Sequence, residues 1–164
     1  MKPYLFATAA LFCATTAAAD LIVTFDEGAP KDRFTFQNTG TGSLPAATLR
    51  IDLKNSAGGL VFDVTDQGAG VEVFQPFELT SGIGAVTKTS PVTDGDTQLA
   101  IDITGLQPNQ KLAFTIDVDD TLGQREITVN DAEISGAEGS ITAQNLRSSA
   151  SFSGDTAVIS VTCS

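Results

Sequence analysis

The chain is poor in the residues that most active sites use. It contains no histidine and no tryptophan, and its single tyrosine is Tyr4. Without histidine it cannot form a Ser-His-Asp triad or a histidine-ligated zinc site, and neither Cys13 nor Cys163 has an imidazole partner for thiol catalysis. It also lacks a glycine-rich phosphate loop that leads into a helix. We therefore predict that the protein is not an enzyme.

Long hydrophobic runs are also scarce, and the one that stands out lies at the N-terminus. Lys2 precedes an apolar run over residues 5–14, and three alanines follow shortly afterwards. This pattern predicts a secretory signal peptide over residues 1–19, cleaved between Ala19 and Asp20, because the run is too short to cross a bilayer. The protein is therefore expected to be exported, to the periplasm or the extracellular space.

Basic side chains are also few in this chain. Residues 20–164 are expected to form a single domain of 145 residues, in which loss of Lys2 leaves 8 basic against 20 acidic side chains, a net charge of −12. Such a surface repels nucleic acid and anionic membranes and attracts cations or basic partners. No second apolar run predicts membrane insertion. Cys163 would be the sole remaining cysteine, interpreted as a free thiol, with pairing between chains as the alternative.

What the chain does have is a regular alternation of apolar and polar residues, with glycine, asparagine and proline between the alternating segments. Period-two alternation is typical of strands that bury one face. Strands are expected at residues 21–25, 34–36, 49–53, 60–64, 71–73, 99–103, 112–118, 127–129 and 157–161. The pattern predicts an all-β fold, an antiparallel β-sandwich of immunoglobulin-like or jelly-roll-like type. Residues 82–93 are expected to form a surface loop or an edge hairpin, and residues 142–150 are ambiguous between helix and strand.

Four of these segments carry an aspartate between two apolar residues: Asp52, Asp63, Asp102 and Asp117. Because side chains alternate between the faces of a strand, each aspartate is expected to point away from the core. Aspartate is unfavourable in the middle of strands. We interpret most of the four as charges that discourage aggregation between sheets, and Asp117 as a functional residue because of its neighbours.

The most distinctive of these segments, residues 114–121, ends in three carboxylates, those of Asp117, Asp119 and Asp120. Carboxylates this close raise each other's pKa unless a cation or hydrogen-bond donors compensate. We predict a Ca²⁺ site at these three residues with Glu133 as a further ligand, and a solvated acidic strand end as the alternative. Alternation places Asp120 on the opposite face from the other two aspartates unless the strand ends first.

Two further polar blocks have competing interpretations. Residues 94–96, Asp-Gly-Asp, are interpreted as a hairpin turn in preference to a cation site. Lys31 and Arg33 are rare cations that either pair with acidic loops or form a small basic patch for the acidic face of another copy. The second interpretation implies self-association.

Several blocks together resemble a known family. They are residues 30–34 (PKDRF), 60–63 (LVFD), 68–74 (GAGVEVF), 114–121 (FTIDVDDT) and 133–137 (EISGA). In these blocks the chain resembles small secreted bacterial proteins that are similar to the core protein of sponge aggregation factors. The resemblance implies a β-sandwich that assembles with copies of itself and supports calcium-dependent aggregation.

The sequence thus favours a secreted, non-enzymatic adhesion or self-association module that depends on calcium. The alternative is an extracellular or periplasmic β-sandwich that binds carbohydrate or another ligand, with a glycan or protein partner. A third interpretation, a hydrolase that uses paired carboxylates, requires no histidine but has no sugar-stacking aromatic platform to support it.

Overall fold

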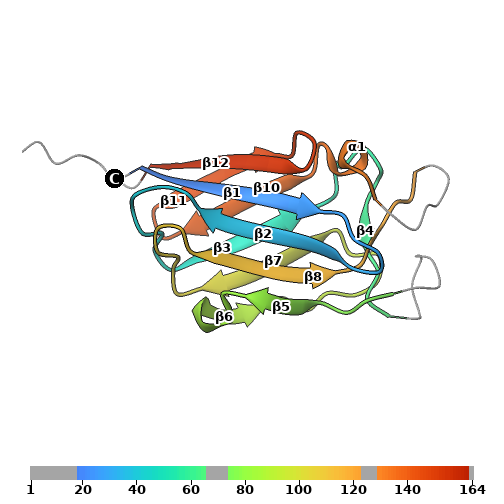
Figure 1. Cartoon of the computed structure of the whole chain (residues 1–164), viewed down its shortest axis with the longest axis horizontal. Helices are drawn as coiled ribbons and strands as arrows, with labels where there is room; N and C mark the ends of the chain where they lie inside the picture. The colour runs from blue at the N-terminus through green and yellow to red at the C-terminus, as the bar shows by residue number, and fades with distance from the viewer. Residues whose placement is uncertain (1–17, 66–73, 123–128, 163–164) are drawn as a thin grey trace, which may run out of the picture.

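A computed structural model describes residues 18–65, 74–122 and 129–162, in which two five-stranded antiparallel sheets pack face to face (Figure 1). The first sheet has the strand order β12-β1-β2-β8-β5 and the second the order β11-β10-β3-β7-β6. The first sheet consists of β1 (Ala18–Asp26), β2 (Asp32–Asn38), β5 (Glu78–Ser81), β8 (Lys111–Ile116) and β12 (Thr156–Thr162). The second consists of β3 (Ala47–Asp52), β6 (Val86–Thr89), β7 (Gln98–Ile103), β10 (Glu138–Ala143) and β11 (Leu146–Ser151).

Four short elements complete the described structure. β4 (Val61–Phe62) and β9 (Val118–Asp119) pair with each other outside the two large sheets. A 3₁₀ turn, η1 (Ile83–Ala85), connects β5 to β6, and a single helical turn, α1 (Asp131–Ile134), precedes β10. Figure 1 shows β4 and α1 at the same end of the sandwich.

The core lies between the two sheets and is formed by the alternating apolar residues. Phe34 on β2 is fully buried, with its ring centroid 5.0 Å from that of Phe25 on β1 and 5.3 Å from that of Phe114 on β8. Ile51, Ile101 and other apolar residues of the second sheet belong to the same buried cluster. Burying one such side chain contributes about 1.5–3 kcal/mol, so the alternating pattern is the main source of stability.

The predicted fold class, an all-β antiparallel sandwich, is confirmed. Residues 82–93 include β6, an edge strand of the second sheet, in line with the edge-hairpin alternative. Residues 142–150, ambiguous in the sequence, belong to the β10–β11 hairpin. The helical turn α1 was not predicted, because four residues are too few to show a helical period.

Some predictions fall wholly or partly outside the described residues. They concern residues 1–17 of the predicted signal peptide, the expected strand at residues 71–73, part of that at 127–129, and Cys163. β1 begins at Ala18, two residues before the predicted cleavage point, and its first two residues pair with β12. Within the described ranges, no helix is long and apolar enough to cross a membrane.

Candidate functional site

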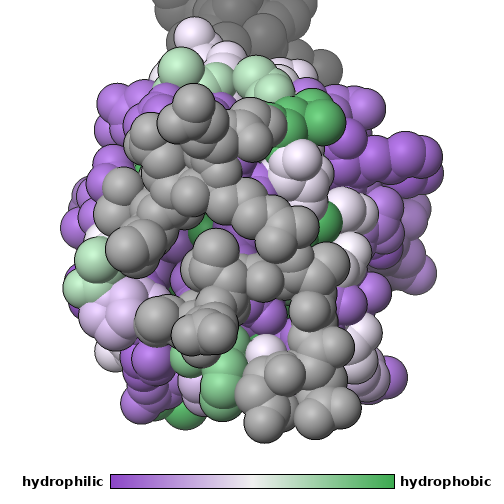
Figure 2. Space-filling view, turned by 90° about the vertical axis from the view of Figure 1, so that its right-hand side faces the viewer, coloured by the Kyte–Doolittle hydropathy of each residue, from purple (hydrophilic) through white to green (hydrophobic). Residues whose placement is uncertain are grey.

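Three chain segments meet at the end of the sandwich that carries β4 and α1, the end that faces the viewer in Figure 2. Backbone hydrogen bonds join them in a ring. Asp63 N–H donates to the Asp117 carbonyl at 3.1 Å, Asp117 N–H to the Gln75 carbonyl at 3.2 Å, and Gln75 N–H to the Asp63 carbonyl at 3.3 Å. This ring interrupts the regular ladder between β8 and β9. The strand geometry that would turn Asp117 away from the core therefore stops at Ile116.

Because the ladder is interrupted, the aspartates at this end are buried. Asp32, Asp63, Asp117 and Asp119, called the acidic cluster below, are each at most 7% exposed. The charge of Asp119 raises the pKa of each of the other three, so the four carboxyl groups are electrostatically coupled. A coupled set of buried carboxylates is a costly arrangement unless something compensates the charge.

Asp32 is the best compensated member of the cluster. Its Oδ1 accepts a hydrogen bond from Gly28 N–H at 3.2 Å, and its Oδ2 accepts one from Val118 N–H at 3.0 Å. Burial nevertheless raises its pKa from 3.8 to about 7, with smaller contributions from the charges of Glu27 and Asp119. Asp32 thus ties the start of β2 to β9 and forms one wall of the cluster.

Asp63 is the least compensated. It is 2% exposed, and neither of its carboxyl oxygens accepts a hydrogen bond from any donor among the described residues. Burial is the largest cause that raises its pKa to about 6, followed by the charges of Asp119 and Asp94. The raised pKa shows that the neutral form of Asp63 is favoured in this environment unless a cation compensates the charge of the ionised form.

Asp117 lies at the centre of the electrostatic network. Its pKa is raised to about 7, first by burial and then by the charges of Asp119, Asp32 and Asp63. The backbone N–H of Val118 offsets part of this effect, and Asp117 Oδ2 has no hydrogen-bond partner among the described residues. Two members of the cluster therefore carry buried oxygens that lack a donor.

The structure brings two of the four predicted site residues together and places the others apart from that network. Asp117 and Asp119 belong to the cluster. Asp120 is also buried and its Oδ2 lacks a donor, but its charge is not among those that raise the pKa of Asp32, Asp63 or Asp117. β9 ends at Asp119, so the exception to the predicted alternation applies, and all three aspartates are buried.

Glu133 lies in α1 and has a structural role that the sequence did not predict. Its Oε2 accepts a hydrogen bond from Asn130 N–H at 2.9 Å, while Asn130 Oδ1 accepts from the N–H groups of Ala132 and Glu133. The two residues form a capping box, the usual way of satisfying free N–H groups at the start of a helix. Its role as a calcium ligand remains a prediction, and the capping bond uses only Oε2 of its two carboxylate oxygens.

The predicted turn at residues 94–96 is present and has a second role. Gly95 has φ of 83°, and Asp96 Oδ2 accepts from Thr93 N–H at 2.8 Å, as in a tight turn. Asp94 Oδ1 accepts from the N–H groups of Val64 and Thr65 at 2.7 and 2.8 Å. The turn therefore fixes the chain that directly follows Asp63.

Asp32 and Asp63 were not predicted as site residues, although the sequence holds a signal for one of them. Asp32 has the same parity as Phe34 and Phe36, so alternation alone places it on the buried face of β2. Asp63 follows the last residue of the two-residue strand β4, where alternation no longer predicts direction. By contrast, Asp52 and Asp102 lie in continuous strands and are only partly buried, bonded to Gln98 and Thr48 respectively.

The chemistry of the cluster is that of hard oxygen donors. Carboxylate oxygens without nitrogen or sulfur ligands suit Ca²⁺ or Mg²⁺ and do not favour zinc or copper. In the described part of the chain, no three acidic residues are already arranged around one point as metal ligands. The unpaired oxygens of Asp63 and Asp117 nevertheless fit a cation, since a cation would compensate charges that no protein donor compensates.

Comparison with family models, curated protein sequences and solved structures found no match to this chain.

Proposed function

We propose that the protein is an exported, non-enzymatic module that self-associates when Ca²⁺ binds at the acidic cluster. The observation that carries the proposal is Asp63, a carboxylate that is 2% exposed, has no donor among the described residues and faces Asp119. An uncompensated buried carboxylate destabilises a fold by several kcal/mol. Such a residue is better explained by an ionic ligand than by packing.

Asp63, Asp117 and Asp119 are the residues proposed to hold the ion. Calcium suits them better than magnesium, because Ca²⁺ accepts irregular sets of six to eight oxygens that include backbone carbonyls and water. Magnesium demands near-ideal octahedral geometry. Asp120 and Glu133, at the same end of the sandwich, are proposed as additional ligands outside this central set.

Self-association is supported by what surrounds the cluster. Leu122 is 64% exposed and Phe74 is 37% exposed, and each lies within three residues of a segment that forms the cluster. Figure 2 shows mostly polar residues at this end, with apolar residues at intervals. Exposed apolar side chains beside an acidic site favour contact only after the charge is neutralised, because two chains that each carry a net charge of −11 repel each other.

The metal claim is tested by calcium titration, followed by calorimetry and thermal melting, of the chain and two variants. We expect Ca²⁺ to raise the melting temperature of the wild-type chain. Asp63→Asn should melt higher than wild type in chelator, because a buried charge is removed, and should lose the response to calcium. Asp52→Asn, on the outer face of β3, is the matched control and should respond like wild type. A wild-type chain whose melting is indifferent to millimolar Ca²⁺ would rule out the site.

The association claim is tested separately by light scattering on a sizing column, in calcium and in chelator. We expect larger particles in calcium, a shift that Leu122→Ser reduces without changing calcium affinity. A monomer under both conditions would contradict self-association but would not contradict calcium binding at the acidic cluster.

A further inference from the structure

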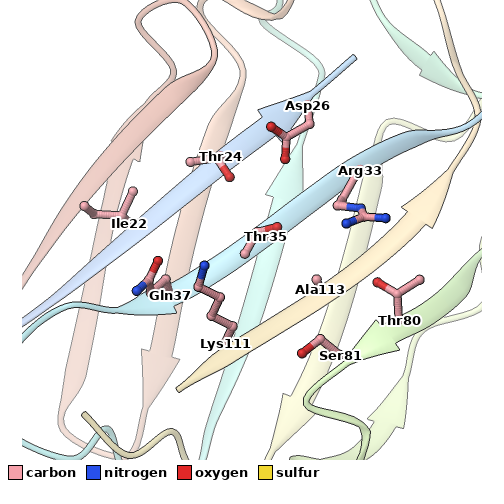
Figure 3. Close-up of a pocket in the computed structure, with 10 residues that line it drawn as sticks. All are labelled: Ile22, Thr24, Asp26, Arg33, Thr35, Gln37, Thr80, Ser81, Lys111 and Ala113. Carbon is pink, nitrogen blue, oxygen red and sulfur yellow. The ribbon is translucent and has the colours of Figure 1, made fainter. Parts of the chain in front are cut away.

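The outer face of the first sheet carries a hollow that is separate from the acidic cluster (Figure 3). It has a volume of about 560 Å³ and lies across β1, β2, β8 and β5. The hollow exists because Ala113, the outward-facing residue in the middle of β8, is small and leaves space between the longer side chains around it. Thr35 lies beside it on the neighbouring strand, at the paired position. Larger residues at either end leave a trough along the strand direction.

Two cations stand at the ends of this trough. Lys111 lies at one end and Arg33 at the other, with Thr35 and Ala113 between them (Figure 3). Arg33 pairs in register with Thr115, four residues along β8 from Lys111, so the two positions are separated by about 13 Å along the strand direction at about 3.3 Å per residue. A ligand that reaches both charges must be extended.

Among the described residues, neither cation has an acidic side chain within ion-pair distance. The ion pair found among the described residues is Lys31–Glu78, at 2.8 Å, outside the hollow. Asp26 lies opposite Arg33 in the β1–β2 register and lines the hollow, but its carboxylate is not within ion-pair distance of the guanidinium. In a chain with so few basic residues, two unpaired cations in one hollow make a local site for anions.

Apart from Ile22, Ala113 and Asp26, the rest of the lining consists of hydroxyl and amide groups. Thr24, Gln37, Thr80 and Ser81 surround the trough from both sides. These side chains donate and accept hydrogen bonds and offer no apolar pocket for a peptide side chain. The backbone N–H and C=O groups of β2 and β8 are already used within the sheet, so a peptide cannot add as a strand on this face. The lining of the hollow is therefore suited to a ligand that carries both hydroxyl groups and negative charge.

We propose that this hollow binds an acidic polysaccharide, with Arg33 and Lys111 each holding a carboxylate of a uronic-acid-type sugar and the hydroxyl and amide residues holding its ring hydroxyls. Charge, rather than stacking, supplies the affinity, because no aromatic side chain lines the hollow. The guanidinium of Arg33 is suited to bidentate contact with a carboxylate, while Lys111 acts as a point charge. The proposal is independent of the calcium site, which lies at the end of the sandwich.

The probe is size-fractionated oligogalacturonate, titrated by calorimetry in chelator so that calcium plays no part, with maltodextrin of similar length as the neutral control. We expect binding of the acidic sugar and not of the neutral one, weakening as salt is added. Arg33→Gln and Lys111→Gln should each weaken binding about tenfold, as expected for one charge-assisted hydrogen-bond site. Asp26→Asn should strengthen it, because the one carboxylate in the lining is removed.

Matched controls separate the hollow from a general effect of charge. Arg147→Gln on β11 and Lys88→Gln on β6 remove one exposed cation each from the second sheet and should leave binding unchanged. Ala113→Leu fills the trough without changing charge and should abolish binding while the far-ultraviolet circular dichroism is unchanged.

Three results would overturn the proposal. They are no binding of oligogalacturonate by the wild-type chain, equal losses in the test and control variants, or binding unaffected by Ala113→Leu. If Arg33→Gln and Lys111→Gln instead break up a wild-type oligomer and leave sugar binding intact, the hollow is a contact between copies of the chain, and the proposal fails in favour of that partner.

Discussion

At the scale of single residues, burial raises the pKa of three carboxyl groups of the acidic cluster towards neutral pH. Asp32 and Asp117 have pKa values raised from 3.8 to about 7, and Asp63 to about 6, with burial as the largest cause in each. The same residues change from neutral hydrogen-bonding groups to mutually repelling charges when the proton leaves. The protonation state of these carboxyl groups therefore changes the free energy of unfolding.

This predicts an unusual pH dependence in chelator. Between about pH 4 and pH 7 the folded chain holds more protons than the unfolded chain, because these carboxyl pKa values are higher in the fold. Stability is then greatest at the acidic end and falls as pH rises through the folded pKa values. Urea unfolding across this pH range should show a declining midpoint. Asp117→Asn should flatten the slope, and a midpoint that rises with pH would contradict the raised pKa values.

A second residue-scale prediction concerns Asn38, which is fully buried at the end of β2. Its Nδ2 donates to the carbonyls of Gly42 and Leu106 at 2.8 and 3.0 Å, and its Oδ1 accepts from Gly40 N–H at 3.1 Å. Asn38→Ala should destabilise the fold by about 1–3 kcal/mol, because it leaves buried backbone groups without partners. Chemical denaturation measures the loss. The exposed neighbour Thr39→Ala should cost less.

At the scale of elements, the one-turn helix α1 is held by its cap rather than by length. A four-residue helix has no stability of its own, so the reciprocal bonds of Asn130 and Glu133 determine whether it forms. Gly58 N–H donates to the Glu133 carbonyl at 2.9 Å, which connects the cap to the segment before β4. The cap thus helps to position the chain that leads to Asp63.

Glu133 has two possible roles, as part of the helix cap and as a calcium ligand, and substitutions in α1 distinguish them. Asn130→Ala should cost about 1 kcal/mol of stability, since the cap is lost. Glu133→Gln keeps a side-chain acceptor for Asn130 N–H and should preserve stability. If Glu133→Gln lowers calcium affinity at unchanged stability, the carboxylate is a ligand. If calorimetry shows equal affinity, it serves as a cap alone.

At the scale of the whole molecule, a single aromatic cluster joins strands of the first sheet to the loop that follows the second sheet's last strand. Phe34 contacts Phe25 and Phe114 within its own sheet, and its ring centroid lies 6.4 Å from that of Phe152, just after β11. Truncation here removes contacts on both sides of the core.

Phe34→Ala should therefore destabilise the fold by about 3–5 kcal/mol, the range for a large aromatic replaced in a core. Val158→Ala, an exposed apolar position on β12, is the comparison and should stay within about 0.5 kcal/mol. Thermal melting distinguishes the two. Similar losses for both would show that the core is not centred on Phe34.

How far the sequence predicts this molecule depends on whether strands are continuous. Alternation identified the long strands and correctly turned Asp52 and Asp102 away from the core, because an unbroken ladder fixes direction at every residue. It failed for Asp63 and Asp117, since the ring of hydrogen bonds with Gln75 breaks the ladder. That ring joins segments far apart in sequence, and local patterns carry no information about it.

The pairing of β1 with both β2 and β12 has a consequence for the order in which the protein is made. The first described strand lies between its near neighbour in sequence and the last strand of the sandwich. A chain that leaves the ribosome N-terminus first cannot complete this sheet until β12 has emerged, so one edge of β1 stays without its partner strand while residues 39–155 are made. Such a delay in completing the first sheet would suit the proposed export, because secretion of an unfolded chain requires that folding is not finished early.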